Sequence, residues 1–532
     1  MELNDRTKAG TVNSTVEDGD RHGYTRDEQD LMRLGKKPVL KRNFGFMQIL
    51  GFSCTVLVTW EGILQVSTPS LLNGGPAGVF WGYLLIWIGS ISVYTVLSEL
   101  SSMAPTAGGQ YHWVAMLAPK SYRKFLSFIT GWVTLIGWQA TTASSAYLAG
   151  TVLQSTILML QPNYAPKPYQ AMLLGWAVLV FAVLINTVGS KTLAHFEGLI
   201  LILHILGFFA ILIPLVYLSE HNNASIFTTF VNSGGWSTQG LSFMVGLPSS
   251  VFALVGVDSC VHDKMAEEVK NASKVVPRAI QISVLLNGAL GLAMLVAYLF
   301  CLGSVDEVVE ESATLGYAYL YVFLKGTGSP GGAATMAMIM WVLGVCCLVG
   351  LMAATSRQLW SFARDHAVPF STQVTKLHPR TLIPVNTIAI TTFISVLLSF
   401  IALGSVVAFS NVVNLSIGGL YASYFIVCAL LLWRRLQGIS PYNARAAMVG
   451  PETLQWGPWK VPGALGIANN LFACAYLLVL WFFSFWPGSV EVNAQSMNFS
   501  SVTFGGTVML AVLWYFVRGR KTYTGPIVEV RI

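Results

Sequence analysis

Charged side chains are scarce in this chain of 532 residues. Asp, Glu, Lys and Arg together make up only 10% of the sequence, whereas hydrophobic residues make up 54%. A soluble domain carries about 25% charged residues. The chain therefore has too few charges to cover a water-facing surface of its size, and this composition excludes a soluble protein.

Motifs for catalysis, metals and cofactors are also missing. The seven cysteines lie in apolar stretches without a CxxC pair, so we predict neither a disulfide framework nor a metal site. The sequence has no Walker-type GxxxxGKS/T, no HExxH and no GxSxG. Residues 326–331 fit GxGxxG, but they lie in a predicted loop with no strand before them. We therefore predict no enzyme and no cofactor.

The sequence has instead a series of long apolar runs. A bilayer core of about 30 Å needs roughly 20 apolar residues per helix. Runs close to or above this length fall at about 44–67, 78–98, 127–158, 169–189, 196–218, 241–262, 279–302, 332–356, 383–403, 406–433, 465–486 and 501–517. This pattern predicts an all-α membrane protein with about twelve transmembrane helices.

The basic residues are unevenly distributed around these runs. If the N-terminus lies in the cytoplasm, 29 of the 31 Lys and Arg residues fall on the inner side, and only Lys167 and Lys325 fall in outer loops. We predict that both termini are cytoplasmic, with a disordered tail at 1–43 and a short tail at 518–532. The net charge of +7 then reflects membrane orientation and does not indicate a nucleic-acid partner.

Two N-glycosylation sequences fall in the predicted outer loops. Asn223 begins Asn-Ala-Ser and Asn498 begins Asn-Phe-Ser. Such triplets are common by chance, but their position agrees with the predicted topology. We predict a glycoprotein with these two acceptors.

Two acidic residues lie inside the apolar runs, each near a glycine. Glu61 precedes Gly62 in the first run, and Asp258 follows Gly256 in the sixth. A carboxylate inside a membrane is costly and persists where it faces a cavity or a partner. Paired interruptions at corresponding positions of two halves are typical of a midplane binding site in transporters. The alternatives are that Glu61 is solvated near the outer end of its helix and that the glycines serve packing alone.

Three segments resemble signatures of amino acid–polyamine–organocation permeases. They are Glu99–Trp113 after the second run, Glu267–Arg278 after the sixth and Ser356–Asp365 after the eighth. The resemblance covers about residues 44–520 and is strongest to the fungal branch that contains GABA, choline and amino acid permeases. It implies a LeuT-like fold with inverted repeats at about 44–218 and 241–433, and two peripheral helices at about 465–517.

The same resemblance assigns roles to individual residues. In many members the first helix is broken at a Gly-Ser-Gly run whose amides hold a substrate carboxylate. The matching stretch here is Trp60-Glu61-Gly62, so an indole and a negative charge stand where a carboxylate would dock. Phe252 matches the aromatic gate of the family, and Asp258 matches its buried acid on helix six.

The fifth run contains a candidate for proton coupling. Some relatives use a lysine on this helix, which the chain lacks. His204 is the nearest candidate, because an imidazole titrates near neutral pH. The alternative is a hydrogen-bonded histidine that serves packing only.

These observations predict a secondary active transporter of small amines or amino acids, such as GABA or choline, that works by alternating access with ion or proton coupling. Carboxylates and aromatic faces together suit ammonium groups. The predicted substrate-binding residues are Thr59, Trp60, Glu61, Gly62, Trp138, Phe252, Ala253, Gly256 and Asp258.

The predicted location is the plasma membrane. A general amino acid permease and an exporter of an amine-containing metabolite remain alternatives. A channel or a nutrient receptor is less favoured, since the sequence has no ring of charges and no large signalling domain.

Overall fold

The computed structural model describes residues 45–161, 163–188, 193–262, 269–379, 381, 383–404, 406–438, 456–493 and 496–526. The side chains of residues 193–197 and 406–410 are also left out of the description. The predicted N-terminal tail at 1–43 lies outside these residues, as does the end of the predicted C-terminal tail.

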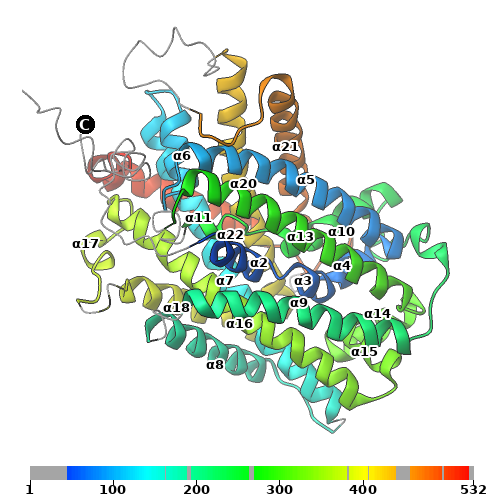
Figure 1. Cartoon of the computed structure of the whole chain (residues 1–532). Coiled ribbons are helices and arrows are strands. Elements are labelled where there is room, and N and C mark those ends of the chain that lie inside the picture. The colour runs from blue at the N-terminus through cyan, green and yellow to red at the C-terminus, as the bar shows by residue number, and fades with distance from the viewer. Residues whose placement is uncertain are drawn as a thin grey trace, which may run out of the picture. The chain divides into compact units, whose positions relative to one another are not determined.

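Within the described residues, twelve helices are long and apolar enough to cross a membrane, and no β-strand is present. The predicted all-α fold with twelve such helices is therefore confirmed (Figure 1). In chain order they are α2 with α3 (Phe46–Leu57, Thr59–Gln65), α5 (Gly75–Met103), α7 (Arg123–Leu160), α8 (Pro168–Thr187), α9 (Leu193–Leu218), α10 with η3 and α11 (Gln239–Val251, Phe252–Leu254, Ser259–His262), α13 (Ala272–Phe300), α16 (Pro330–Arg364), α18 with α19 (Val385–Ser399, Ile401–Gly404), α20 (Val406–Leu436), α21 (Gly463–Phe483), and α22 with η5 and α23 (Ser500–Trp514, Tyr515–Gly519, Arg520–Thr522).

Short helices between these spans were not predicted from the sequence. They are α4 (Ser67–Leu72), α6 (Gln110–Leu117), η2 (Ala224–Phe227), α14 (Val305–Leu315), α15 (Ala318–Thr327) and α17 (Ser371–Val374). Local chemistry explains the ends of two of them, because α14 and α15 stop at Gly316 and Gly328, which have φ angles of +83° and +59°. The next helix, α16, then begins with a Ser329 cap and Pro330 in its first turn.

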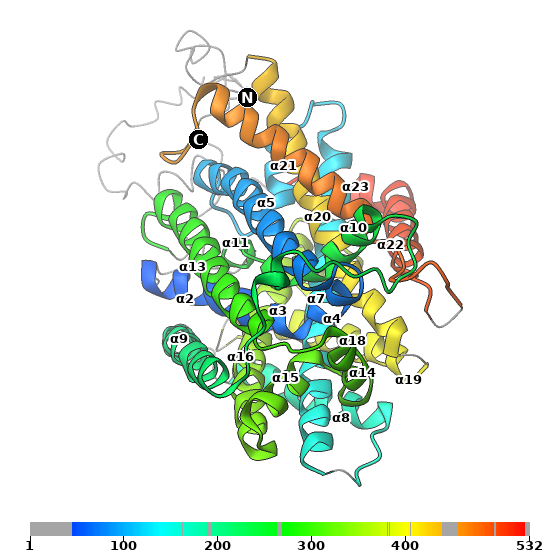
Figure 2. The ribbon, with the colours of Figure 1, turned by 90° about the vertical axis from the view of Figure 1, so that its right-hand side faces the viewer.

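Equivalent helices of the two predicted halves contact one another. The second helices, α5 and α13, run side by side in both Figure 1 and Figure 2. Tyr83 donates to the carbonyl of Gly288 at 2.9 Å, and Trp87 donates to the carbonyl of Val284 at 2.9 Å. The third helices, α7 and α16, form another extensive contact. These contacts join the second helix of one predicted half to the second helix of the other, and the third helix to the third.

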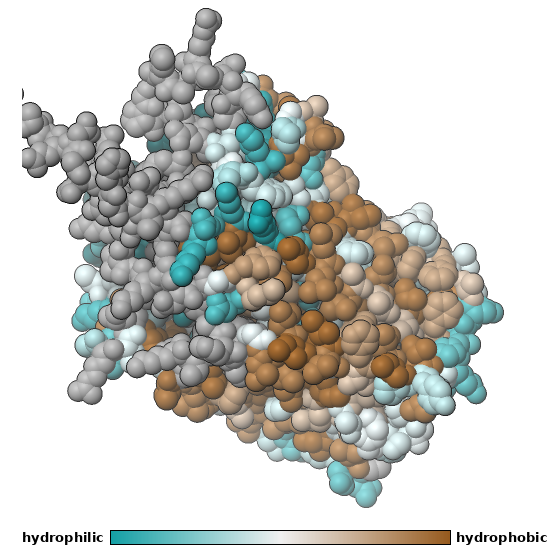
Figure 3. Space-filling model, in the orientation of Figure 1, coloured by the Kyte–Doolittle hydropathy of each residue, from teal (hydrophilic) through white to brown (hydrophobic). Residues whose placement is uncertain are grey.

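The outer surface of the helices is strongly apolar. Figure 3 shows a broad hydrophobic belt between two hydrophilic margins. Large side chains such as Leu184, Ile213 and Val502 are exposed by 52%, 62% and 69%. Exposure of so many apolar side chains to water costs free energy, whereas contact with lipid chains does not. The chain is therefore a multi-pass integral membrane protein.

The loops at the two ends of the helices differ in charge. We call the end with loops 104–122, 365–379 and 456–462 the basic side, and the end with loops 219–238, 301–329 and 484–493 the acidic side. Residues Asp306, Glu307, Glu310 and Glu311 lie on the acidic side, in α14.

The segment after α22 returns to the helices on the basic side. Tyr523 is fully buried there. Its ring lies 5.4 Å from that of Phe128 and 6.2 Å from that of Phe362, and its hydroxyl lies 2.5 Å from that of Ser127. The chain end is thus anchored between α7 and α16.

Candidate substrate-binding site

The first membrane span is interrupted at Val58. This residue has φ 36° and ψ 48°, a left-handed conformation that is strained for a β-branched side chain. The helix resumes immediately, and the Gly62 amide donates to the Val58 carbonyl at 2.7 Å. The family resemblance assigned the break to Trp60-Glu61-Gly62, and this assignment is wrong by about one turn, because these three residues lie within α3.

Gly62 serves close packing between the two broken helices. A Cβ atom at this position would lie 3.3 Å from the Cβ of Ala253 in η3. The absence of a side chain therefore lets the first and sixth spans approach each other. The break also frees the Val56 carbonyl, which accepts a hydrogen bond from the Cys347 thiol of α16 at 3.4 Å.

The sixth span is interrupted after η3. Val255 is extended, and Gly256 has φ +106°, a conformation that L side chains rarely adopt. Tyr94 of α5 donates a hydrogen bond to the Leu254 carbonyl released by the break. Trp138 of α7 packs beside Gly256, 3.5 Å from the position a Cβ would take.

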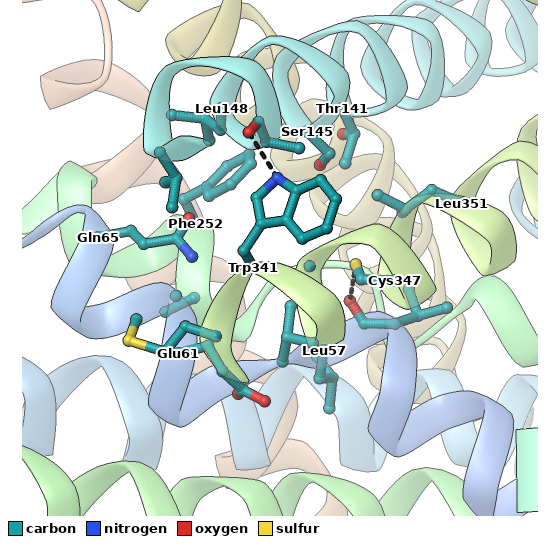
Figure 4. Close-up of a pocket in the computed structure, with 18 of the residues that line it drawn as sticks. Leu57, Glu61, Gln65, Thr141, Ser145, Leu148, Phe252, Trp341, Cys347 and Leu351 are labelled. Carbon is teal, nitrogen blue, oxygen red and sulfur yellow. Dashed lines mark hydrogen bonds between the residues drawn. The ribbon is translucent and has the colours of Figure 1, made fainter. Parts of the chain in front are cut away.

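A small cavity of about 60 Å³ lies between the two breaks. Its walls come from α2–α3, α7, η3 with the following residue, and α16; the lining residues include Val58, Glu61, Gly62, Gln65, Thr141, Ser145, Phe252, Ala253, Trp341, Gly344 and Cys347. In Figure 4 the indole of Trp341 stands in the middle of these residues, with Phe252 and Gln65 to one side and Glu61 below it.

A larger vestibule of about 780 Å³ adjoins this cavity on the acidic side. The two spaces share Gln65 and Leu148 as lining residues. Helix α20 contributes Asn411, Val413 and Asn414 to the vestibule but no residue to the small cavity.

Of the nine predicted substrate-binding residues, four line the small cavity. These are Glu61, Gly62, Phe252 and Ala253. The other five are buried nearby without lining it: Thr59, Trp60, Trp138, Gly256 and Asp258. Trp60 instead faces α9, where its ring lies 5.7 Å from His204 and 6.0 Å from Phe208.

Glu61 and His204, which the sequence could only treat separately, form a direct pair. The His204 Nδ1 atom lies 2.7 Å from the Glu61 Oε1 atom, and both side chains are only 1% exposed. Within the described residues, neither Glu61 Oε2 nor His204 Nε2 has a hydrogen-bond partner. The pair therefore leaves one carboxylate oxygen of Glu61, a cavity-lining residue, and one imidazole nitrogen of His204 without a hydrogen bond among the described residues.

Asp258 belongs to a separate polar cluster on the basic side of the cavity. Its Oδ2 atom accepts from Gln110 of α6 at 2.6 Å and contacts His262 Nε2 at 3.0 Å. Its Oδ1 atom accepts from the Tyr424 hydroxyl of α20. On α6, the next residue, Tyr111, donates to Asp365 at the end of α16 at 2.8 Å. Asp258 thus connects α11 to α6 and α20.

Four of the cavity-lining residues were not predicted from the sequence: Trp341, Thr141, Ser145 and Gln65. An apolar run does not reveal which of its side chains face a cavity, so Trp341 could not be separated from the other 15 tryptophans. The hydroxyls of Thr141 and Ser145, spaced four residues apart, form a polar face on α7 that helical spacing could have suggested.

The two predicted glycosylation acceptors differ in environment. Asn223 is exposed and caps η2. Asn498 is only 4% exposed, and its amide nitrogen donates to the carbonyls of Ser484 at 3.0 Å and Trp486 at 2.9 Å. A glycosylated amide keeps only one N–H, so a glycan on Asn498 would remove at least one of these hydrogen bonds, and Asn498 is the less suitable acceptor of the two.

Comparison with known proteins extends these observations. A family model described as amino acid permease matches residues 44–510. A Macrophomina phaseolina protein, named as a predicted amino acid/polyamine transporter, is 29% identical over 455 residues, which cover 85% of this chain and 97% of that protein. The choline transporter of Saccharomyces cerevisiae is 27% identical, with coverage of 91% and 83%. Amino-acid permease 2 of Neurospora crassa is 24% identical, with coverage of 97% and 90%. The chain therefore belongs to the amino acid permease family, within the amino acid–polyamine–organocation superfamily of membrane transporters.

Proposed function

We propose that this transporter carries a small organic amine, or an amino acid recognised mainly through its ammonium group, by alternating access. The observation that carries this proposal is the position of Glu61. Glu61 is one of the residues that line the cavity between the two broken helices, and its Oε2 atom has no partner among the described residues. A buried carboxylate oxygen in this position is suited to accept hydrogen bonds from an ammonium group.

Aromatic side chains support the same choice of substrate. Phe252 and Trp341 both line the cavity, and a cation over such a ring gains about 0.5–2 kcal/mol. We propose that Trp341 and Phe252 provide the aromatic faces for the ammonium group. From the sequence, this role was expected of Trp60, Trp138 and Phe252. The negative charge of Glu61 disfavours a substrate carboxylate in the same place.

The vestibule gives a route to this cavity from the acidic side. Buried contacts of Asp258, Trp138 and His262 lie on the basic side of it. We propose that these contacts hold the basic side closed while the acidic side is accessible. Asp258 then acts as a gate residue and does not touch substrate.

Proton coupling is assigned to the Glu61–His204 pair. The support for this assignment is geometric, because the imidazole lies 2.7 Å from the carboxylate that we propose as the ammonium ligand. A protonophore is expected to change substrate accumulation.

One observation favours a second candidate function, a permease that recognises the α-carboxylate of an amino acid. Ser145 and Gln65 bring a hydroxyl donor and an amide donor to the cavity, whereas the Thr141 hydroxyl donates to the Gly137 carbonyl of its own helix at 2.8 Å. Ser145 and Gln65 could hold a carboxylate at a distance from Glu61. Competition by amines without a carboxylate separates the two candidates.

The test is uptake in a cell that lacks its own transporters for these compounds. Labelled choline, GABA, a polyamine and several amino acids are supplied with and without a protonophore. Glu61→Gln should reach the membrane and lose most amine uptake, whereas the matched change Glu310→Gln, at an exposed position on α14, should keep it. Full uptake by Glu61→Gln would rule out Glu61 as the ammonium ligand.

We propose the plasma membrane as the location, with the basic side in the cytoplasm. The proposal is supported by the excess of Lys and Arg on that side. The vestibule would then open to the outside of the cell, as uptake of a nutrient requires.

A further inference from the structure

One face of α16 brings very different side chains to the cavity. Trp341, Gly344 and Cys347 are spaced three residues apart and all line it. Trp341 is the largest lining side chain, and its indole N–H donates to the Ala149 carbonyl of α7 at 2.9 Å. Gly344 is open on its cavity side, since a Cβ there would meet no atom within 4 Å. The bulkiest lining residue and a lining glycine are therefore one turn apart on the same helix.

The cavity is too small for an organic amine while Trp341 keeps this position. Its volume of about 60 Å³ accommodates a few water molecules, whereas small-molecule sites typically measure about 300–1,000 Å³. A substrate that reaches Glu61 must therefore displace a lining side chain. Trp341 is only partly buried, and its indole is held by the hydrogen bond to Ala149. Phe252 lies in η3 at the helix break.

We infer that Trp341 and Gly344 together set the largest substrate that this transporter accepts. The inference rests on the proposed transport of an amine and adds the residues that select for size. Entry of the substrate displaces the indole from Ala149, and the substrate's alkyl groups occupy the space over Gly344. Compact ammonium groups fit with a small displacement of the indole, and bulkier ones need a larger one.

Substitutions at the two positions are expected to change the acceptance of large substrates in opposite directions. Trp341→Phe keeps an aromatic face for the cation but removes ring volume and the N–H donor, so larger substrates should gain. Gly344→Ala adds a methyl group in the open space, so larger substrates should lose. A change of one methylene in such a pocket alters selectivity by about tenfold or more.

The experiment measures competition against the labelled substrate by a graded series of quaternary ammonium compounds, from tetramethyl to tetraethyl and tetrapropylammonium. Trp341→Phe should improve the relative inhibition by the largest compounds by about tenfold, and Gly344→Ala should weaken it by about tenfold. One matched control is Trp176→Phe, since the Trp176 indole N–H donates a hydrogen bond to the Ser399 hydroxyl outside the cavity. The other is Gly505→Ala, at an exposed position on α22 where an added Cβ would meet no atom within 4 Å.

An unchanged size profile in both cavity variants, with uptake retained, would overturn the inference. If Trp341→Phe fails to reach the membrane, Gly344→Ala still decides the question. If the wild-type chain transports no amine, the proposed substrate class fails first, and the size series is rebuilt from homologues of the compound that is carried. Shifts of opposite sign at Trp341 and Gly344 would then still support the size filter.

Discussion

At the scale of single residues, Glu61 and His204 act as a unit. Both are almost completely buried and lie 2.7 Å apart. Removing one partner of a buried hydrogen-bonded pair leaves the other polar group buried and unsatisfied, which costs about 1–3 kcal/mol, whereas replacing both partners by apolar residues costs much less. This non-additivity distinguishes a true pair from two independent polar residues.

We therefore predict that Glu61→Leu and His204→Leu each lower the thermal stability of the solubilised protein, and that the double variant recovers part of the loss. The measurement is the melting temperature Tm followed by size-exclusion chromatography after heating. Glu307 and Lys325 form the control pair, since their side chains are exposed by 43% and 41% and such pairs contribute about 0–1 kcal/mol. Losses at Glu61 and His204 that simply add would show that the two side chains do not interact.

At the scale of helices and loops, α6 links the two halves through neighbouring side chains. Gln110 binds Asp258 next to the break in the sixth span, and Tyr111 binds Asp365 at the end of α16. Any motion that separates α11 from α16 on the basic side must break one of these contacts. This arrangement explains why Asp258 can be important for transport without facing the cavity.

For Asp258→Asn we expect substrate binding to the solubilised protein to change little and uptake to fall about tenfold, the effect of a bias of about 1.4 kcal/mol between the two access states. Equilibrium binding and initial uptake rates are measured on the same preparation. Asp306→Asn, on the exposed surface of α14, serves as the control. If the variant loses binding and uptake to the same extent, Asp258 is a substrate ligand and not a gate residue.

The sequence was informative about elements and less so about their details. Hydrophobic runs located the twelve spans, because a bilayer sets both their length and their polarity. The break at Val58 could not be predicted, since a valine in a left-handed conformation goes against its own preference and depends on the packing around it. The same holds for the Glu61–His204 contact and for Trp341, which arise only when helices distant in sequence come together.

For the whole molecule, the environments of Asn223 and Asn498 provide a test of orientation. If the acidic side faces the outside, Asn223 lies on an exposed loop of that side and is accessible to glycosylation. Asn498 is buried and holds the Ser484 and Trp486 carbonyls. We predict that Asn223→Gln removes the shift in mobility caused by glycosidase, and that Asn498→Gln leaves it in place but reduces stability.

A glycan at Asn498 would contradict the structure around that residue. A glycan that is lost in neither variant would place modification elsewhere. Protease protection of tags at the two ends of the chain provides an independent measurement, because we expect both termini to be cytoplasmic and therefore shielded in intact cells.

The anchoring of Tyr523 has a practical consequence for anyone who alters the end of this chain. A stop codon just upstream would remove a ring that fills the space between Phe128 and Phe362, and loss of a buried aromatic side chain typically costs about 3–5 kcal/mol. A reporter fused just upstream of Tyr523 would therefore lower the stability of the protein whose abundance it is meant to report. A fluorescent protein or purification tag is better attached beyond Tyr523, where the ring can keep its place.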